Sequence, residues 1–117
     1  MSATTQHDEF RPFAVDVHPQ RDVVRVAPMG EIDLATVGGL RARIEELLSS
    51  GFTRVTLDLQ GVTFMDSTGL RLVLELVQAS RDDHWELSVT DVPCAVLRVF
   101  ELTGVLDVLP LGEPECS

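Results

Sequence analysis

The segment best suited to chemistry is Asp66-Ser67-Thr68-Gly69-Leu70, between a β-rich run and an amphipathic stretch. Asp, Ser and Thr are preferred where helices begin, because their oxygens accept hydrogen bonds from unpaired backbone N–H groups. Gly69 is unusual there, since a glycine inside a helix lowers stability by about 1 kcal/mol relative to alanine. We interpret the glycine as a sign that another group approaches the backbone closely.

Ser67 is the residue of this segment that suits covalent modification. A serine at the start of a helix is exposed, and the helix N-terminus offers free N–H groups and the positive end of the helix dipole. A phosphate would be tolerated there and would add a charge of about −1.5 to −2. A helix cap and nothing more is the usual role of an isolated serine at such a position. The sequence leaves both roles open.

Enzyme mechanisms that use these residue types do not match their surroundings. A serine hydrolase elbow has glycine two residues before the nucleophile, where this chain has Met65, and no histidine is close to Ser67 in the sequence. An aspartic protease motif has its glycine one residue nearer to the aspartate, in a β-rich dimer. A phosphate-binding P-loop needs a lysine, and the chain has none. We expect no enzyme activity.

Metal-binding patterns are also weak. Asp33, Asp58 and Asp66 are candidate oxygen ligands, but they follow no ligand-spacing motif and are better explained as caps and strand-end residues. Cys94 and Cys116 are too few for a disulfide framework and are not spaced as a metal site. We expect no metal and no cofactor.

The stretch after the serine predicts an amphipathic helix over about 67–80. At about 100° per residue, one face collects the expected core residues Leu70, Val73, Leu74 and Val77. A third sector holds Leu72, Leu76 and Ala79. Either the next helix or the tail covers this sector, or it is an exposed apolar strip of the kind that binds a protein partner. In the second case a phosphate on Ser67 would disrupt the interface by repulsion and desolvation.

Alternating hydrophobicity and turn signals assign the other elements. Asp33 or Thr36 caps a helix that runs to Ser50, and Pro93 in its first turn opens another that Gly104 ends. Strands are expected at 13–17, 22–27, 55–59, 86–90 and 106–109, with a turn at 18–21 and a connecting loop at 60–66. The order β-β-α-β-α-β-α-β predicts one α/β domain with a mixed four- to five-stranded sheet and helices packed alongside. The domain is expected over 13–109, after a flexible leader (1–12) and before a flexible acidic tail (110–117).

The charge limits the class of partner. Among 117 residues, 19 acidic and 9 basic side chains give a formal charge of −10. Such a chain repels phosphate backbones and anionic lipids, so we expect neither nucleic acid nor membrane among its partners. No apolar run approaches the roughly 20 residues of a membrane span, and the first residues do not form a signal peptide. We expect a cytoplasmic protein, a monomer or a weak dimer.

The chain resembles the STAS-domain anti-sigma factor antagonists of bacteria. The segments in the family's order and spacing are Gly30-Glu31-Ile32-Asp33, Leu57-Asp58-Leu59, Val62, Phe64-Met65-Asp66-Ser67-Thr68-Gly69-Leu70 and Glu101-Leu102-Thr103-Gly104. The resemblance runs from about 13 to 109, and Asp-Ser-Thr-Gly-Leu is its specific part. It implies a small mixed sheet with helices on one side.

The resemblance also implies a regulatory cycle. The unphosphorylated antagonist binds an anti-sigma factor and so releases the sigma factor. The anti-sigma factor, a GHKL-type kinase that supplies the ATP and metal ion, phosphorylates the serine that matches Ser67. A PP2C-type phosphatase then restores binding. The implied contact positions are Asp33, Asp66, Thr68, Gly69 and Leu72, with Leu76 added from the strip.

One departure from the family and one alternative function remain. The segment Arg81-Asp82-Asp83-His84-Trp85 lacks the glycine that often makes the turn before the following strand. The alternative function is a STAS accessory or scaffolding subunit of a membrane-transport or signalling assembly, in which Ser67 is only a helix cap. The two functions differ in whether Ser67 accepts a phosphate.

Overall fold

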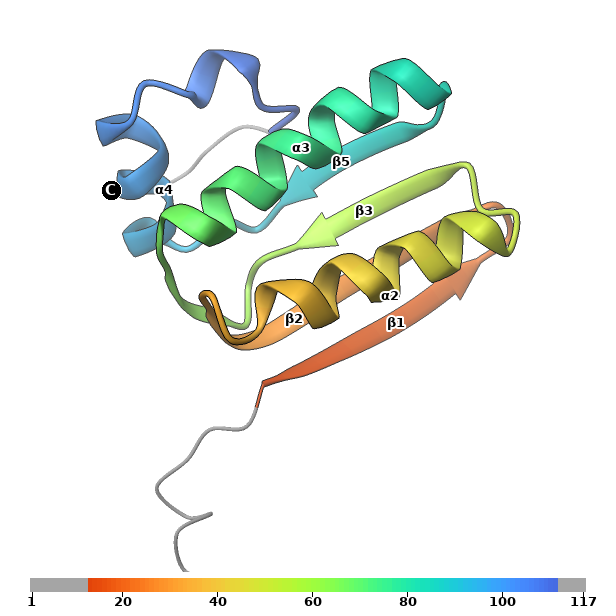
Figure 1. Ribbon diagram of the computed structural model, residues 1–117, viewed down its shortest axis with the longest axis horizontal. Coiled ribbons are helices and arrows are strands. Elements are labelled where there is room, and N and C mark those ends of the chain that lie inside the picture. Colours follow the sequence, from red (N-terminus) through yellow and green to blue (C-terminus); the bar gives the residue numbers. More distant parts are fainter. Residues whose placement is uncertain (1–12, 112–117) are drawn as a thin grey trace, which may run out of the picture.

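A mixed sheet of five strands, with three helices, makes up most of residues 13–111, the part of the chain that the computed structural model describes (Figure 1). The expected leader (1–12) and residues 112–117 of the expected tail lie outside the described residues. The elements follow in the order β1 (Ala14–Gln20), β2 (Val23–Ile32), α2 (Val37–Ser49), β3 (Arg54–Asp58), β4 (Val62–Met65), α3 (Ser67–Asp83), β5 (Glu86–Thr90), α4 (Cys94–Leu102) and a 3₁₀ turn, η1 (Leu106–Val108). The predicted α/β class is confirmed.

The ten-residue strand β2 organises the sheet because it pairs with three other strands. It forms an antiparallel hairpin with β1. Its first half pairs in parallel with β3, and its last residues, Gly30–Ile32, pair in parallel with β4. The register shifts between Gly30 and Glu31, and Gly30 has a φ of 109°, a conformation that favours glycine. Strand β5 extends the sheet beyond β3.

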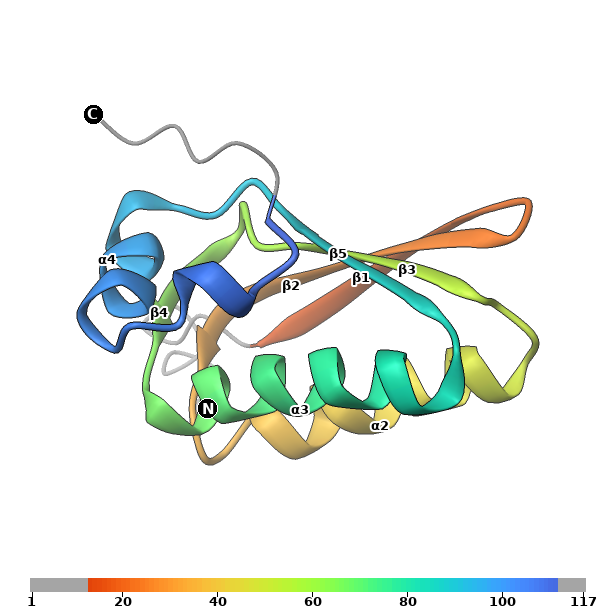
Figure 2. The same ribbon diagram turned by 90° about the horizontal axis from the view of Figure 1, so that it is seen from above.

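Helices α2 and α3 lie side by side against one face of this sheet (Figure 2). Alternate residues of β2 point to that face, and Val24 and Val26 are fully buried there. The next residues in the alternation, Arg25 and Met29 among them, are exposed on the opposite face. Helix α4 packs beside β4 at the end of the molecule where α3 begins.

Asp58 ties the end of β3 to the sheet. It is 1% exposed, and its Oδ2 accepts a hydrogen bond from Nε of Arg25 at 2.8 Å. Its Oδ1 accepts from the backbone N–H of Gln60 at 2.9 Å. The interpretation of Asp58 as a strand-end residue is confirmed, and its bonds fix the turn that leads into β4.

Several predicted boundaries agree with the structure. Helix α2 follows Thr36 and ends at Ser49, and Gly51 takes a positive φ of 108° just after it. Gly104 likewise takes a positive φ of 75° after α4. Glycine occupies these positions because an L side chain is strained in that conformation.

Four local predictions were wrong. Residues 60–66 are not only a loop, because Val62 to Met65 pair with β2 and form β4. The first turn is tighter than expected, with β1 continuing to Gln20. Pro93 precedes α4 as its N-cap instead of lying in its first turn. Residues 106–108 form η1, and the place beside β5 is taken by Leu111, which bridges to Val89.

Helix α3 is longer than predicted, and its end explains the missing glycine. It continues to Asp83, where His84 adopts the left-handed conformation with φ 60° and donates its backbone N–H to the Ser80 carbonyl. A histidine therefore makes the turn into β5, at the place where the family resemblance led us to expect a glycine.

The buried face of α3 is wider than the predicted one, since Leu72 and Leu76 are buried as well as the predicted Leu70, Val73 and Val77. Leu72 and Leu76 are 1% and 6% exposed, so of the two alternatives for their sector the covered one is correct and there is no exposed apolar strip. The buried arc is centred on Gly69, Val73 and Leu76. The hydrophobic pattern of α3 did not show the centre of this arc, because Gly69 has no side chain and was not counted as a core residue. Gly69 nevertheless lies on the side of the helix that packs most closely against the sheet.

Gly69 is required by this packing. A Cβ at position 69 would lie 2.6 Å from Met65 Cγ, 2.8 Å from Ile32 Cγ2 and 3.2 Å from the Ile32 carbonyl oxygen. The group that approaches the Gly69 backbone is therefore the protein's own β2–β4 pair, and no external ligand is needed to explain the glycine.

We predict that Gly69→Ala lowers the free energy of unfolding by about 1–3 kcal/mol, because the added methyl group forces α3 away from β2 and β4. The measurement is urea denaturation followed by circular dichroism. Gly39→Ala is the matched control, since a Cβ at position 39 meets nothing within 4 Å. That change should raise stability by about 0.4–1 kcal/mol. Equal effects of the two substitutions would refute the packing explanation.

Candidate functional site

Parallel pairing brings two aspartates to neighbouring positions at one edge of the sheet. Ile32 of β2 is opposite Met65 of β4, so Asp33 and Asp66 are the next residues on two adjacent strands. The backbone N–H of Asp66 donates to the Ile32 carbonyl at 3.3 Å. The sequence predicted both residues for the site, and their proximity comes from the register of β2 and β4.

Asp66 caps α3. Its Oδ1 accepts from the backbone N–H groups of Thr68 at 2.9 Å and Gly69 at 3.2 Å, and also from the Thr68 hydroxyl. The Thr68 hydroxyl contributes most to lowering the pKa of Asp66 below its usual value of 3.8; partial burial opposes the shift, and the two N–H groups add to it. Asp66 is therefore a carboxylate at neutral pH.

Ser67 is the first residue of α3 and is exposed. Because Asp66 is the capping residue, the hypothesis that Ser67 serves only as a helix cap is not supported. Within residues 13–111 no hydrogen bond involves the Ser67 side chain. Its hydroxyl is therefore accessible and has no structural role in starting the helix.

The expectation of free N–H groups for a phosphate needs correction. The Thr68 and Gly69 N–H groups already bond to the Asp66 carboxylate, and the Leu70 N–H bonds to the Asp66 carbonyl at 3.1 Å. A phosphate on Ser67 would have to compete with an ionised side chain for these donors. Of the N–H groups of the first turn, only that of Ser67 itself has no acceptor within residues 13–111, so few donors are left for a phosphate.

Asp33 organises the loop before α2. Its Oδ1 accepts from the backbone N–H groups of Ala35 at 3.0 Å and Thr36 at 3.2 Å. The Thr36 hydroxyl donates to the Glu31 carbonyl at 2.8 Å. These bonds hold the loop in a fixed turn, and Leu34 projects from it with 77% of its surface exposed.

The predicted site residues separate into two groups. Asp33, Asp66, Ser67 and Thr68 are exposed or partly exposed at one end of the molecule. Gly69, Leu72 and Leu76 are buried in the folded domain, so they do not contribute side-chain surface to a partner.

Two residues at this end were missed. Leu34 and Phe64 are exposed large hydrophobic residues, at 77% and 48%, and each is close in sequence to an aspartate of the site. The sequence analysis placed both residues in cap or loop segments. That placement could have predicted their exposure, because a large apolar residue with no helix or strand face to bury it stays at the surface. We call Asp33, Leu34, Asp66, Ser67 and Thr68 the serine surface. Phe64 is not part of it, because Met65 faces Gly69 of α3 and the preceding residue of the strand points to the other face of the sheet.

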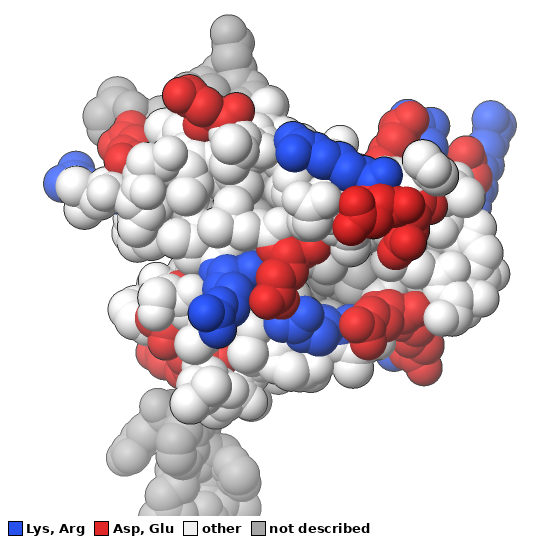
Figure 3. Space-filling view, turned by 45° about the horizontal axis from the view of Figure 1, so that its top comes forward, with Lys and Arg blue, Asp and Glu red and all other residues white. Residues whose placement is uncertain are grey.

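The charge distribution sets this surface apart. In Figure 3 the surface over the beginning of α3, at the left, is largely uncharged, whereas charged side chains crowd the right. An exposed leucine on a weakly charged surface that also presents an accessible hydroxyl is typical of a protein-binding surface. Within residues 13–111, no cluster of side chains suits a metal ion. None of the helices described there is both long and apolar enough to cross a membrane.

Comparison with known proteins identifies the family. Residues 13–110 match the family model described as Mlab, STAS domain. The chain belongs to the STAS-domain family. The resemblance predicted from the Asp-Ser-Thr-Gly-Leu segment is thus confirmed.

Relatives of this STAS domain carry regulatory names. The anti-sigma-B factor antagonist of Staphylococcus aureus is 32% identical over 84 residues, which cover 72% of this chain and 78% of the relative. The anti-sigma-B factor antagonist of Staphylococcus epidermidis is 30% identical over 92 residues, covering 79% and 85%.

Solved structures share the fold of this STAS domain. An anti-sigma factor antagonist from Mycobacterium paratuberculosis superposes with a TM-score of 0.72 at 24% identity, covering 88% of this chain and 87% of that one. The unphosphorylated anti-sigma factor antagonist SpoIIAA gives 0.68 at 23% identity, covering 87% and 89%. The predicted mixed sheet is confirmed by both.

We predict that Asp66→Ala lowers the free energy of unfolding by about 1 kcal/mol at pH 7, because α3 loses its cap. The folded-state pKa of Asp66 is lowered, so its contribution is complete above the unfolded value near 3.9 and is lost as the pH falls through the folded value. The difference between wild type and Asp66→Ala should therefore be constant from pH 7 to about pH 5 and shrink below about pH 4. Urea denaturation at several pH values measures it.

Asp66→Asn is the matched control. Asparagine caps helices as well as aspartate does but does not titrate in this range. The difference between Asp66→Asn and Asp66→Ala should not change with pH. The prediction would be contradicted if the difference in stability between wild type and Asp66→Ala stayed constant down to a pH of about 2.5, which is well below the usual pKa of an aspartate.

Proposed function

We propose that this STAS domain is an anti-sigma factor antagonist that phosphorylation of Ser67 switches off. In the unphosphorylated state it binds an anti-sigma factor kinase of the GHKL type, which then releases its sigma factor. The kinase supplies ATP and the metal ion. A PP2C-type phosphatase removes the phosphate, and the cycle takes place in the cytoplasm.

The observation that carries this proposal is that Asp66, and not Ser67, caps α3. Asp66 caps the helix with two backbone N–H bonds, which leaves the neighbouring hydroxyl exposed. The names of the relatives agree with this role, since they are anti-sigma-B factor antagonists. A protein with this surface needs no catalytic residues of its own, because the partner performs the phosphoryl transfer.

A phosphate on Ser67 would act locally. The chain already has a formal charge of −10, so one more dianion changes its long-range field little. At short range the phosphate would adjoin the Asp66 carboxylate, whose N–H partners are already occupied. It would also add a strongly hydrated group to a surface that exposes Leu34. A bound partner would then have to desolvate that charge, which weakens binding.

The serine surface supplies the contact positions. Asp33, Asp66 and Thr68 keep the roles that the family resemblance gives them. Leu34 replaces the buried Leu72 and Leu76 as the apolar contact, while Gly69 allows α3 to pack closely on the sheet. A monomer or a weak dimer leaves this surface free for the kinase.

The first test concerns Ser67. Incubation of wild type with ATP and the anti-sigma factor that it captures from its own lysate should add the mass of one phosphate, and Ser67→Ala should gain none. Ser67→Ala should bind that factor as wild type does. Ser67→Asp should bind it at least about tenfold more weakly, which is about 1.4 kcal/mol. Isothermal titration calorimetry measures the affinities.

Two results would count against the proposal. One is an intact mass without phosphate on Ser67, which favours an accessory subunit of a larger assembly. The other is undiminished binding by Ser67→Asp. A Ser67→Ala variant that is destabilised by several kcal/mol would show instead that the serine is mainly structural.

The second test concerns the apolar part of the serine surface. Leu34→Ala should weaken binding of the same factor about tenfold, because a well-exposed leucine fills a pocket of the partner. Its stability should change little, since Leu34 is 77% exposed. Gln78→Ala, an exposed position in the C-terminal half of α3, is the control and should leave the affinity unchanged. Equal affinities for all three proteins would remove Leu34 from the interface.

A further inference from the structure

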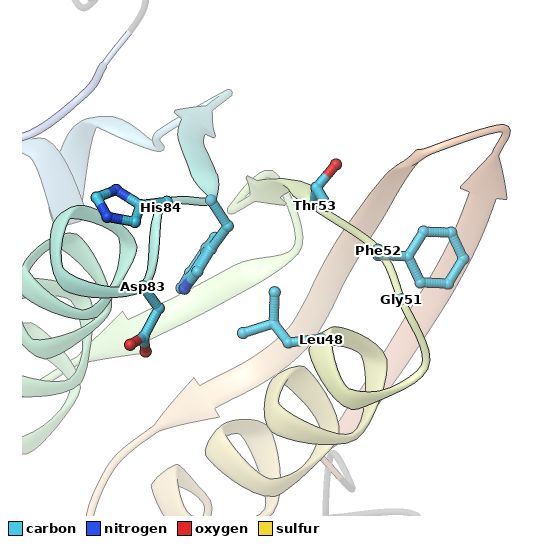
Figure 4. A pocket seen from close by; sticks show the side chains of 7 residues that line it. Leu48, Gly51, Phe52, Thr53, Asp83 and His84 are labelled. Atoms are coloured by element: carbon cyan, nitrogen blue, oxygen red, sulfur yellow. The ribbon is translucent and has the colours of Figure 1, made fainter.

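A pocket of about 270 Å³ lies at the other end of the molecule from Ser67 (Figure 4). It forms between the C-terminal ends of α2 and α3 and the starts of β3 and β5. Helix α3 has 17 residues, so at about 1.5 Å per residue the pocket is about 25 Å from Ser67. It is therefore separate from the serine surface, and the proposed switch does not use it.

The interior of the pocket is mainly apolar. Leu48 from α2 and Phe52 from the following loop are partly buried, and Trp85, at the start of β5, is 9% exposed. Figure 4 shows Leu48 and Asp83 on opposite sides, one from each helix. The small exposed part of the Trp85 side chain thus contributes to a concave surface instead of a flat one.

The electrostatics of the pocket favour a positive charge. Helix α2 ends at Ser49 and α3 at Asp83, so the negative ends of two helix dipoles adjoin the same space. The Asp83 carboxylate has neither an ion pair nor a hydrogen bond within residues 13–111. Its neighbours differ, because Asp82 accepts from Gln78 at 3.1 Å and Glu86 pairs with Arg54 at 3.2 Å.

Basic groups near the pocket do not neutralise it. Arg54 follows the lining residue Thr53 but is engaged by Glu86. Arg81, in the last turn of α3, is exposed and is not among the lining residues. His84 does line the pocket, but Figure 4 shows its ring on the side of α3 away from Leu48. Asp83 is therefore the charged lining group without a counter-ion in the described part of the chain.

We propose that this pocket binds an alkyl cation, that is, an alkylammonium or alkylguanidinium group. The alkyl part would pack on Leu48, while the charge would lie near Asp83 and the Trp85 ring, whose electron-rich face attracts cations. A volume of about 270 Å³ suits a four- or five-carbon chain. The cation belongs either to a free amine or to a lysine or arginine side chain of a partner.

The chain provides its own reporter for this site, because Trp85 is its single tryptophan. Titration of the full chain with n-butylammonium chloride, at constant ionic strength, should change the Trp85 emission saturably with a dissociation constant in the millimolar range. The neutral analogue 1-butanol should bind at least about threefold more weakly, since it lacks the charge. An unsaturable response to n-butylammonium, or an equal response to 1-butanol, would overturn the proposal.

Two variants with the same change in charge locate the site. Asp83→Asn should weaken n-butylammonium binding about three- to fivefold, as expected for the loss of an exposed charge pair. Glu101→Gln, on α4 at the other end of the molecule, should leave it unchanged. Circular dichroism checks that both variants are folded. Equal affinities of the two variants would show that the effect is net charge and that the pocket does not select cations.

Two further probes distinguish the source of the cation. 1,4-Diaminobutane represents a free amine, and Nα-acetyl-lysine methylamide represents a side chain presented by a protein. Tighter binding of the diamine supports a free amine, and tighter binding of the capped lysine supports a partner side chain. Binding of neither probe would overturn the proposal. None of these results depends on phosphorylation of Ser67, so the proposed switch is tested separately.

Discussion

The parallel pairing of β4 with the last residues of β2 is the constraint on which the site depends. It places Ile32 opposite Met65. The residues that follow, Asp33 and Asp66, therefore lie side by side. Gly69 then lets α3 begin directly on this pair, where a Cβ would collide with both strands. Movement of β4 would therefore displace the first turn of α3, including the serine, relative to the loop that carries Leu34.

The capping of α3 explains how a modifiable serine coexists with a stable helix start. In a serine that capped the helix, phosphorylation would replace the hydroxyl acceptor by charged phosphate oxygens, and the hydrogen bonds of the helix end would change with the signal. Here Asp66 holds the N–H groups, so the hydroxyl beside it is free to change without disturbing the first turn. In the proposed function, the modification acts on a partner through charge and desolvation and leaves the fold of this domain unchanged.

Much of the fold was accessible from the pattern of residues. Val24 and Val26 alternate with exposed neighbours in β2, and Leu40 and Ile44 repeat at helical spacing in α2. Local patterns failed where burial came from contacts distant in sequence. Leu72 and Leu76 are buried although they lie off the predicted face, because the buried arc is centred on a glycine. The sequence predicted a loop at Val62–Met65, because four residues are too few to show the alternating hydrophobicity of a strand. These residues form a strand only through their pairing with β2.

The sequence by itself determined the family and identified Ser67 as the candidate for modification, since the Asp-Ser-Thr-Gly-Leu segment is specific and capping preferences are local. Only the tertiary structure decided what surrounds Ser67. The register of β2 and β4 determines that Asp33 neighbours Asp66, and the burial of α3 removes Leu72 and Leu76 from the surface and leaves Leu34 exposed. The tertiary structure also brings the C-terminal ends of α2 and α3 together at one pocket, which Trp85 lines. Proximity across a sheet and exposure after packing are properties of the folded chain, so no local pattern contains them.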